Sequence, residues 1–254
     1  MKHYWIVLAL ILVSASCEDK KTKTPAKEEI QTNNQTIKDS TLSLGRQGLA
    51  DGAARKQKHR TAIKDSFSVE NPMIKSQAEL KDFLYAYGEE NPENRVRIKT
   101  SMGDIEVRLF DDTPLHRANF ILLVKEDYFK GSYMHRVSPD FIIQGGNSDN
   151  YELQDKRARI GDYLIPNEAS SRHTHVRGAL SSAKYTEMNV SNATAPFEFF
   201  IVQAPRGAHH LDGEHTVFGE VTQGMDVVDK INAVAIDEQE WPLTNIYLDA
   251  ELID

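Results

Sequence analysis

Residues 134–146 read MHRVSPDFIIQGG. His135 and Arg136 stand side by side near the start of this stretch, and an apolar run beginning at Phe141 leads into Gln144 and two glycines. The stretch has none of the spacings typical of a phosphate loop, a nucleophile elbow or a pair of metal ligands. Its distinctive feature is a permanently charged arginine among apolar residues, and this combination needs a chemical reason.

The sequence around this stretch predicts a β-rich domain. Over residues 96–109, apolar and charged side chains alternate on either side of 101–104, which predicts two antiparallel strands joined by a tight turn. A helix is expected to begin at Thr113-Pro114, an N-cap followed by a first-turn proline, and a second helix to cover 225–234. Short strands and loops are expected over 133–223. Two helices among many short strands predict a mainly β fold, a closed antiparallel β-barrel with a helix at each end.

A short helix is expected before the barrel, within residues 76–92. Ser76 and Glu79 have the spacing of a capping box. The apolar residues that follow have the i, i+3, i+4, i+7 spacing of an amphipathic helix: Leu80, Phe83, Leu84 and Tyr87. Gly88 is placed to end this helix.

The first 17 residues combine an apolar run, small residues and a single cysteine. Residues 4–13 (YWIVLALILV) form an apolar run that is too short to span a membrane, which needs about 20 residues. Small residues then lead to Cys17, the only cysteine of the chain. This order resembles a bacterial lipoprotein signal. The resemblance implies a signal peptide over 1–16 and a lipid on Cys17, in an exported protein anchored to a bacterial envelope membrane. Ser14 stands where such signals usually have leucine, so an ordinary signal peptide followed by an incidental cysteine is the alternative.

Residues 17–75 are expected to form a flexible tether to that anchor. Residues 18–65 contain no Phe, Tyr or Trp, so they cannot bury enough apolar surface to offset the entropy lost on folding. Residues 95–254 hold 16 Lys and Arg against 25 Asp and Glu. A segment this acidic is unsuited to nucleic-acid binding. Nothing in the sequence predicts more than a monomer.

Four motifs follow one another along the rest of the chain. They are YFKG with MHRV and FIIQGG within 128–146, GALSSA at 178–183, FEFFI at 197–201 and HLDGEHTVFG at 210–219. In this order and spacing the chain resembles the cyclophilin family of peptidyl-prolyl cis/trans isomerases over residues 93–254. The resemblance implies an eight-stranded barrel capped by two helices. It also implies isomerisation of X–Pro bonds in folding or unfolded polypeptides, without a cofactor or a metal.

The chemistry of that reaction gives Arg136 its reason. An X–Pro bond isomerises over a barrier of about 18–20 kcal/mol because amide resonance must be broken. As the bond twists, the proline nitrogen gains a lone pair, and a fixed donor aimed at it stabilises the twisted state more than either planar state. Arginine suits this role because it stays protonated and its donors have a rigid arrangement.

By resemblance, Arg136 is the catalytic donor, and His135 and Gln144 hold the peptide and orient the arginine. The other substrate-binding residues implied by the family form the proline pocket or line the peptide. They are Phe141, Ile142, Phe200, Leu211 and His215 for the pocket, with Ala183, Lys184, Glu198 and His210 beside the peptide. Phe141 and Phe200 also have an ordinary interpretation as barrel core. The backbone around Ala183 is expected to bond the substrate chain.

Three of these residues depart from the family pattern. Glu198 stands where glutamine is usual, and a carboxylate there can pair with Arg136, either orienting it or holding it back from the substrate. Lys184 replaces a frequent asparagine, and His210 replaces a tryptophan found in many members. If Glu198 neutralises Arg136, the alternative function is a weakly active proline-binding scaffold or chaperone module.

Several histidines near the motifs remain without a role in this interpretation. His209, His210 and His215 lack the spacing usual for metal ligands, so no metal site is expected. His173 and His175 are expected to be loop residues.

Overall fold

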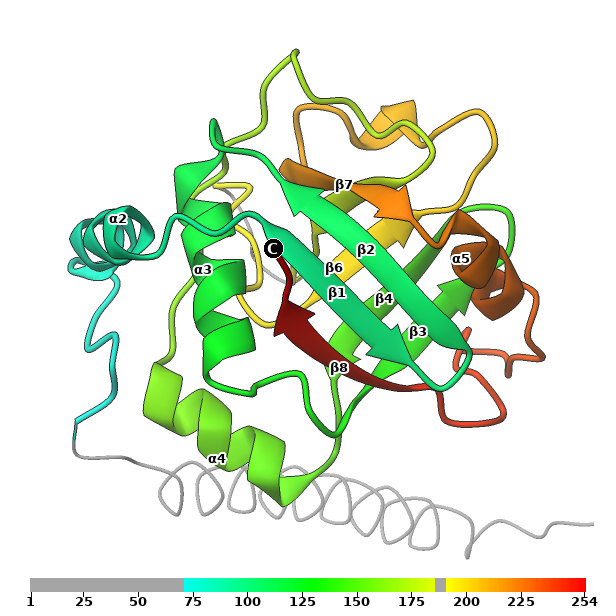
Figure 1. Ribbon diagram of the computed structural model, residues 1–254, viewed down its shortest axis with the longest axis horizontal. Coiled ribbons are helices and arrows are strands. Elements are labelled where there is room, and N and C mark those ends of the chain that lie inside the picture. Colours follow the sequence, from blue (N-terminus) through cyan, green and yellow to red (C-terminus); the bar gives the residue numbers. More distant parts are fainter. Residues whose placement is uncertain (1–70, 186–190) are drawn as a thin grey trace, which may run out of the picture. The chain divides into compact units, whose positions relative to one another are not determined.

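The computed structural model describes residues 71–185 and 191–254, and its central element is a β-barrel (Figure 1). Within these residues eight antiparallel strands close in the order β1-β2-β7-β5-β6-β4-β3-β8. The strands are β1 (Arg95–Thr100), β2 (Gly103–Leu109), β3 (Ser132–Ser138), β4 (Ile142–Asn147), β5 (Ala179–Ser182), β6 (Phe199–Val202), β7 (Val217–Gln223) and β8 (Tyr247–Leu252). The predicted barrel is therefore confirmed. The expected signal peptide, Cys17 and most of the expected tether lie outside the described residues.

The first two strands show how the sequence pattern forms the barrel. Val96 and Ile98 on β1 are fully buried. Arg97 between them lies on the outer face, where it donates to Glu106 on β2 at 3.0 Å and to Glu251 on β8 at 3.1 Å. Alternating side chains point to opposite faces of a strand, so the apolar set fills the barrel and the charged set faces solvent. The predicted pair of strands at 96–109 is confirmed.

Two helices, α3 (Pro114–Lys125) and α5 (Met225–Asn232), lie on opposite sides of the barrel in Figure 1. Both were predicted, and α3 begins after Thr113 as expected. The Thr113 hydroxyl donates to the Phe110 carbonyl at 3.2 Å instead of capping the helix. The capping group is the Glu168 carboxylate, which accepts from the backbone nitrogens of Leu115 and His116, each at 3.0 Å.

Aromatic rings join α3 to the barrel. The ring centroid of Phe120 on α3 lies 5.1 Å from that of Phe129, 5.6 Å from that of Phe199 and 5.5 Å from that of Phe218. These tilted and edge-to-face contacts are the preferred geometries for aromatic pairs. The helix therefore packs against the inner sides of β6 and β7, two strands that carry motif residues.

The short helix before the barrel is α2 (Leu80–Glu90), and it packs against α3. It continues two residues beyond Gly88, so the expectation that this glycine ends it is wrong. A Cβ at Gly88 would lie 3.1 Å from the Cβ of Ala118. The glycine is thus needed inside the helix, where it lets α2 approach α3 closely.

The described chain is already packed before α2. Ile74, in the last part of the tether predicted for 17–75, is buried, and its N–H donates to the Ile160 carbonyl at 2.9 Å. Ile160 ends α4 (Tyr151–Ile160), a helix in the region where only strands and loops were expected. Only Leu153 and Ile160 of this helix are buried, so its sequence lacks an apolar stripe. The Asn150 side chain caps it by accepting from the Glu152 nitrogen at 2.9 Å.

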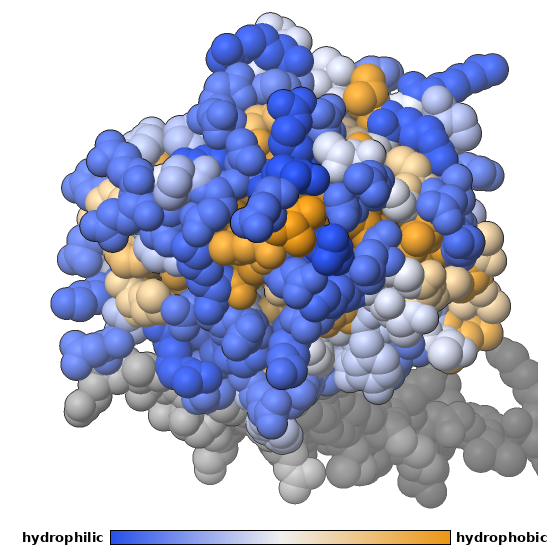
Figure 2. All heavy atoms as spheres, viewed as in Figure 1, coloured by the Kyte–Doolittle hydropathy of each residue, from blue (hydrophilic) through white to orange (hydrophobic). Residues whose placement is uncertain are grey.

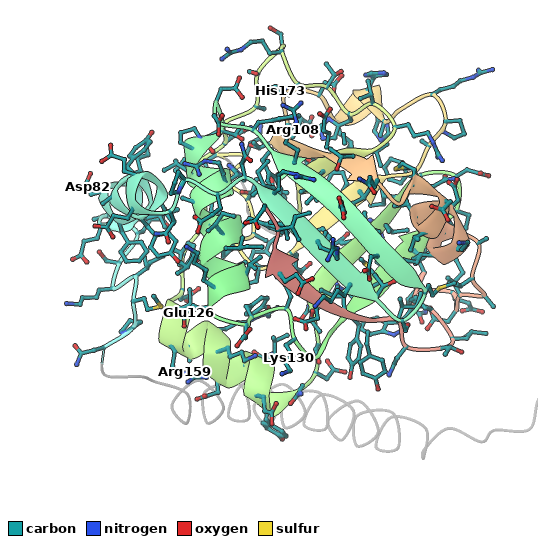
Figure 3. The ribbon with its side chains drawn as sticks, in the orientation of Figure 1. Asp82, Arg108, Glu126, Lys130, Arg159 and His173 are labelled. Atoms are coloured by element: carbon teal, nitrogen blue, oxygen red, sulfur yellow. The ribbon has the colours of Figure 1, made fainter. Side chains whose placement is uncertain are left out.

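The outer surface of the described part is mainly polar. Figure 2 shows hydrophilic residues over most of one face, with apolar residues exposed in small patches. Charged side chains such as Asp82, Lys130 and Arg159 point away from the ribbon (Figure 3). Within 71–185 and 191–254, none of the helices combines the length and the apolar character that crossing a membrane requires.

Candidate active site

Three neighbouring strands align the central residues of the predicted site. Arg136 on β3 is the register partner of Gln144 on β4, and Gln144 is the register partner of Phe200 on β6. The register of β3 and β4 shifts between Met134 and Arg136, and such a bulge re-aims the side chains that follow it. The cation, the amide and the aromatic ring therefore form one row across the sheet.

The two glycines after Gln144 allow the strands to come this close. Gly146 has a φ of +102°, and a Cβ there would lie 2.3 Å from the Phe197 carbonyl oxygen. Only glycine fits a position with this backbone conformation and this contact. The conformation brings Glu198, the residue after Phe197, against the side chain of Gln144.

Arg136 is held at two of its nitrogen atoms. Its Nε donates to Glu240 Oε2 at 2.7 Å, and its Nη1 lies 3.4 Å from Gln144 Oε1. About a third of the side chain is exposed, with a relative area of 38%. In the described part of the chain, no acceptor for Nη2 is present. Arg136 therefore combines a fixed guanidinium plane with donors free for a substrate.

The Glu198 side chain contacts Gln144, Asn147 and His135. Its carboxylate accepts from Gln144 Nε2 at 2.9 Å and from Asn147 Nδ2 at 3.0 Å, and it lies 3.4 Å from His135 Nε2. Burial alone raises the pKa of this carboxyl, but the contacts with His135 and Gln144 outweigh burial and lower the pKa of Glu198. The sequence suggested that Glu198 could pair directly with Arg136, and this ion pair is not formed. Gln144 lies between the two side chains and bonds both of them.

The residues expected to form the proline pocket gather beside Arg136. Phe200 is buried in a cluster with Ile142, against which Phe141 and Leu211 pack. The His215 ring meets Phe200 edge to face, with centroids 5.5 Å apart. His215 Nδ1 lies 2.9 Å from the Ser182 carbonyl oxygen, and burial lowers the pKa of this histidine. These residues thus form an apolar cluster with an imidazole at one side, and burial disfavours the charged form of that imidazole.

His210, Lys184 and Ala183 were also expected beside the bound peptide. The His210 ring stacks on Phe141, with centroids 5.3 Å apart. The Lys184 ammonium turns to Asn192 at 3.2 Å and Glu214 at 3.6 Å. The Ala183 N–H donates to the Glu198 carbonyl at 3.3 Å, and its carbonyl accepts from Ala195 at 2.8 Å. These two bonds hold the backbone at Ala183 beside Glu198 and Ala195, and the expectation that the stretch around Ala183 and Lys184 bonds a substrate chain stays a prediction.

Three polar residues of the site have no signal in the motifs. Asn147 bonds Glu198, Glu240 bonds Arg136, and His175 lies under the pocket, where its ring stacks 5.9 Å from that of Phe200. His175 lies in a loop, as expected, but it is fully buried, so it has a structural role that the sequence did not indicate. The side chain of Glu240 is 104 residues away from Arg136 in the chain, and no local pattern links them.

His175 belongs to a buried Asp-His-Ser arrangement. Its Nδ1 lies 2.7 Å from Asp212 Oδ1 and its Nε2 lies 3.0 Å from Ser181 Oγ. Ser181 and His175 are both fully buried, so a substrate has no access to the hydroxyl. These three residues are therefore not a nucleophilic triad. Their role is structural, since the His175 ring stacks against Phe200.

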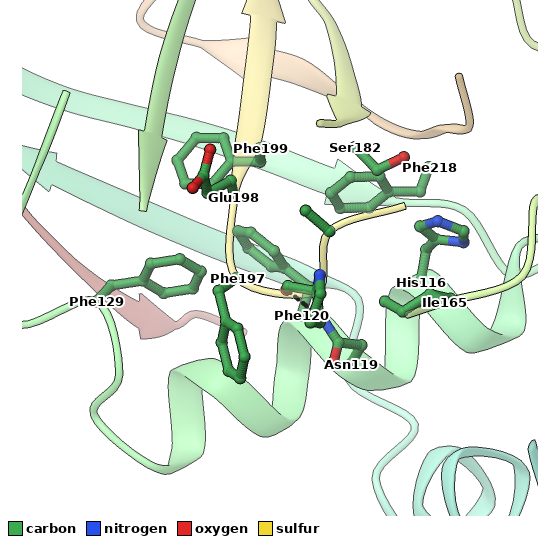
Figure 4. Close-up of a pocket in the computed structure, with 12 residues that line it drawn as sticks. His116, Asn119, Phe120, Phe129, Ile165, Ser182, Phe197, Glu198, Phe199 and Phe218 are labelled. Atoms are coloured by element: carbon green, nitrogen blue, oxygen red, sulfur yellow. Dashed lines mark hydrogen bonds between the residues drawn. The ribbon is translucent and has the colours of Figure 1, made fainter. Parts of the chain in front are cut away.

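Figure 4 shows a small pocket lined in part by α3 and β6. Its lining is largely aromatic and includes Phe120, Phe199 and Phe218, with Glu198 at one edge. Arg136 and Phe200 are not among the residues that line it. The pocket therefore lies between α3 and residues 195–199 and is separate from the apolar cluster beside Arg136. In the described ranges, 71–185 and 191–254, no group of three or more His, Cys, Asp or Glu residues is placed to hold a metal ion.

Comparisons with known proteins agree with this geometry. The family model for cyclophilin type peptidyl-prolyl cis-trans isomerases matches residues 95–250. A peptidyl-prolyl cis-trans isomerase of Acinetobacter baylyi is 38% identical over 140 residues, which cover 54% of this chain and 70% of that protein. A peptidyl-prolyl cis-trans isomerase of Schizosaccharomyces pombe is 34% identical over 149 residues, or 58% of this chain and 91% of that protein.

Solved structures give the same result. The crystal structure of a cyclophilin type isomerase from Cryptosporidium parvum matches with a TM-score of 0.55 and 25% identity, covering 64% of this chain and 98% of that one. The structure of the same protein in the presence of the dipeptide Ala-Pro matches with a TM-score of 0.53 over 63% of this chain and 99% of that one. This chain belongs to the cyclophilin-type family of peptidyl-prolyl cis-trans isomerases, enzymes that interconvert the cis and trans forms of X–Pro bonds.

Proposed function

We propose that this isomerase accelerates rotation of X–Pro bonds by donating from Arg136 to the proline nitrogen of the twisted bond. The observation that supports this is the double anchoring of the guanidinium on Glu240 and Gln144, which leaves Nη2 without a protein acceptor among the described residues. A donor fixed in advance needs no reorganisation when the nitrogen gains its lone pair. It therefore stabilises the twisted state more than the planar states.

The apolar residues next to Arg136 hold the proline ring. Phe141, Phe200 and Leu211 pack in one cluster, and His215 closes one side of it by its contact with Phe200. Burying the ring there fixes the proline while the chain before it rotates. The substrate class we propose is therefore a proline-containing polypeptide in an extended, unfolded or folding state. The solved relative that was determined with the dipeptide Ala-Pro supports this class.

Relaxation of a short X–Pro peptide from cis to trans tests this proposal. The full chain is compared with Arg136→Ala and with Arg159→Ala, an exposed arginine on α4 that forms an ion pair with Asp155 at 3.2 Å. Wild type and Arg159→Ala are expected to be equally fast, and Arg136→Ala to lose about 100-fold or more in kcat/KM, the scale of removing one oriented donor. An Arg136→Ala variant as fast as wild type contradicts the role of Arg136.

A second candidate function is a proline-binding module with low turnover. The observation that favours it is the ion pair between Arg136 and Glu240, because the carboxylate offsets part of the charge that the proline nitrogen needs. Both side chains are about one-third exposed, with relative areas of 38% and 34%, so water and salt screen this offset. We therefore favour the enzyme with full turnover, and a wild type that relaxes the peptide near the uncatalysed rate supports the module instead.

We also propose that the protein is exported and anchored through a lipid on Cys17, and acts on proteins that fold in the bacterial envelope. The apolar run at residues 4–13, the small residues at 14–16 and the single cysteine support this proposal. Cell fractionation of wild type and Cys17→Ser tests it. Wild type is expected in the membrane fraction with incorporated labelled fatty acid, and Cys17→Ser without the label. A wild type that carries no label contradicts lipid anchoring.

A further inference from the structure

The loop between α5 and β8 places a carboxylate next to Arg136. Glu240 lies in this loop with a φ of +63°, a left-handed conformation that is unfavourable for a residue with a side chain. Its carbonyl accepts from the Val137 N–H at 2.8 Å, and its N–H donates to the Asp237 carbonyl at 3.1 Å. The surrounding bonds thus impose an unfavourable backbone at this residue, and such positions concentrate at functional sites.

Both carboxylate oxygens of Glu240 accept hydrogen bonds from side chains on β3. Oε2 accepts from Arg136 Nε at 2.7 Å and Oε1 accepts from Ser138 Oγ at 2.6 Å. The hydroxyl of Ser138, together with Arg136, lowers the pKa of Glu240 against the opposing effect of burial. The carboxylate is therefore charged at neutral pH, and its position is set by two donors two residues apart on one strand.

This arrangement fixes the plane of the guanidinium. The group is rigid and planar, so one anchor leaves it free to rotate and two anchors at different nitrogens do not. The hydrogen bond from Arg136 Nη1 to Gln144 is long and weak, at 3.4 Å, whereas the bond from Arg136 Nε to Glu240 is short, at 2.7 Å. We infer that Glu240 is a positioning residue that orients Arg136 toward the substrate, an inference that rests on the proposed role of Arg136 as the donor.

Two substitutions at Glu240 separate orientation from charge. Glu240→Ala removes the anchor, and kcat is expected to fall about tenfold with KM within about twofold, because misplacing a catalytic group by a fraction of an ångström is costly. Glu240→Gln removes the charge but keeps an oxygen for Arg136 Nε and an amide N–H for the Ser138 hydroxyl. It is expected to retain most of the wild-type kcat.

Glu238 provides a matched control. It lies in the same loop, is exposed, and makes no hydrogen bond or ion pair with any residue in the described part of the chain. Glu238→Ala is expected to match wild type in kcat and KM. A second readout is independent of turnover: the Nε–H resonance of Arg136 in the full chain, labelled with ¹⁵N-arginine, is expected to be protected from exchange in wild type and Glu240→Gln and to lose protection in Glu240→Ala.

The outcomes distinguish this inference from the proposed function. If Arg136→Ala is slow but Glu240→Ala keeps the wild-type kcat or exceeds it, the positioning role is overturned while the donor role stands. If Glu240→Gln is as slow as Glu240→Ala, the charge of Glu240 acts rather than its position, and the inference is again overturned. If Arg136→Ala is as fast as wild type, both proposals fail.

Discussion

The carboxylate of Glu198 accepts a hydrogen bond of 2.9 Å from the side-chain amide nitrogen of Gln144. A carboxylate only accepts, so the amide must present its nitrogen to Glu198 and its oxygen to the other side. That oxygen faces Arg136. An acidic residue in this position therefore fixes the orientation of Gln144 without touching Arg136.

The substitution Glu198→Gln tests whether this carboxylate restrains Arg136. The oxygen of the introduced amide can still accept from Gln144, but its nitrogen then faces the Asn147 donor, and one buried bond is lost. We expect kcat within about threefold of wild type and a free energy of unfolding lower by about 1 kcal/mol. Peptide relaxation and urea denaturation measure the two quantities. A kcat several times faster than wild type would show that Glu198 damps Arg136.

The first strands were predictable from local alternation, as in Val96, Arg97 and Ile98. Strands β5 and β6 are buried at every position and show no such alternation, so the eight-stranded barrel was predictable only through the family motifs. The pocket was predictable only through the family motifs, since Phe141 and Phe200 alone are indistinguishable from core residues. Helix α4 was missed because it buries only Leu153 and Ile160 and is held by Asn150 and by tertiary contacts.

The polar partners of the site were the least predictable part. Glu240 meets Arg136 through a loop more than 100 residues further along the chain, and the choice of Glu240 over Glu198 as the partner of Arg136 depends on strand register. Likewise, Glu168 caps α3 from 52 residues away, whereas the sequence indicated Thr113. Local patterns specify backbone elements, but pairings between distant side chains require the assembled fold.

The cap formed by Glu168 is expected to contribute to stability. Glu168→Ala leaves two backbone N–H groups at the start of α3 and the His116 ring, which lies 2.6 Å from the carboxylate, without their partner. We expect the free energy of unfolding to fall by about 2 kcal/mol. Glu152→Ala, in the exposed first turn of α4, is the control and is expected to cost about 0.5 kcal/mol. If urea denaturation gives the same loss of unfolding free energy for Glu168→Ala and Glu152→Ala, the capping role of Glu168 is contradicted.

Stability is expected to depend on pH through His175. Burial lowers the pKa of this histidine below its ordinary value of 6.5, outweighing the contact with Asp212. The unfolded chain then binds a proton at a higher pH than the folded chain, so this stability is present above 6.5 and is lost as pH falls toward the folded pKa. The free energy of unfolding should decrease between about pH 7.5 and pH 5.5.

The variant His175→Gln isolates this contribution, because His215, whose pKa is also lowered by burial, remains. We expect a smaller decrease in the free energy of unfolding over the same pH interval than in wild type, measured by urea denaturation at each pH. An unchanged decrease would mean that His175 titrates alike in the folded and unfolded states.

The most direct test of the account is to measure turnover and binding separately in Arg136→Lys. Lysine keeps the positive charge but lacks the planar fork that Glu240 and Gln144 orient. If Arg136 acts on the twisted bond, kcat should fall about 10- to 100-fold while the affinity for an Ala-Pro peptide stays within about threefold. A parallel loss of affinity and turnover, or an unchanged kcat, would show that Arg136 binds the peptide without stabilising the twisted state.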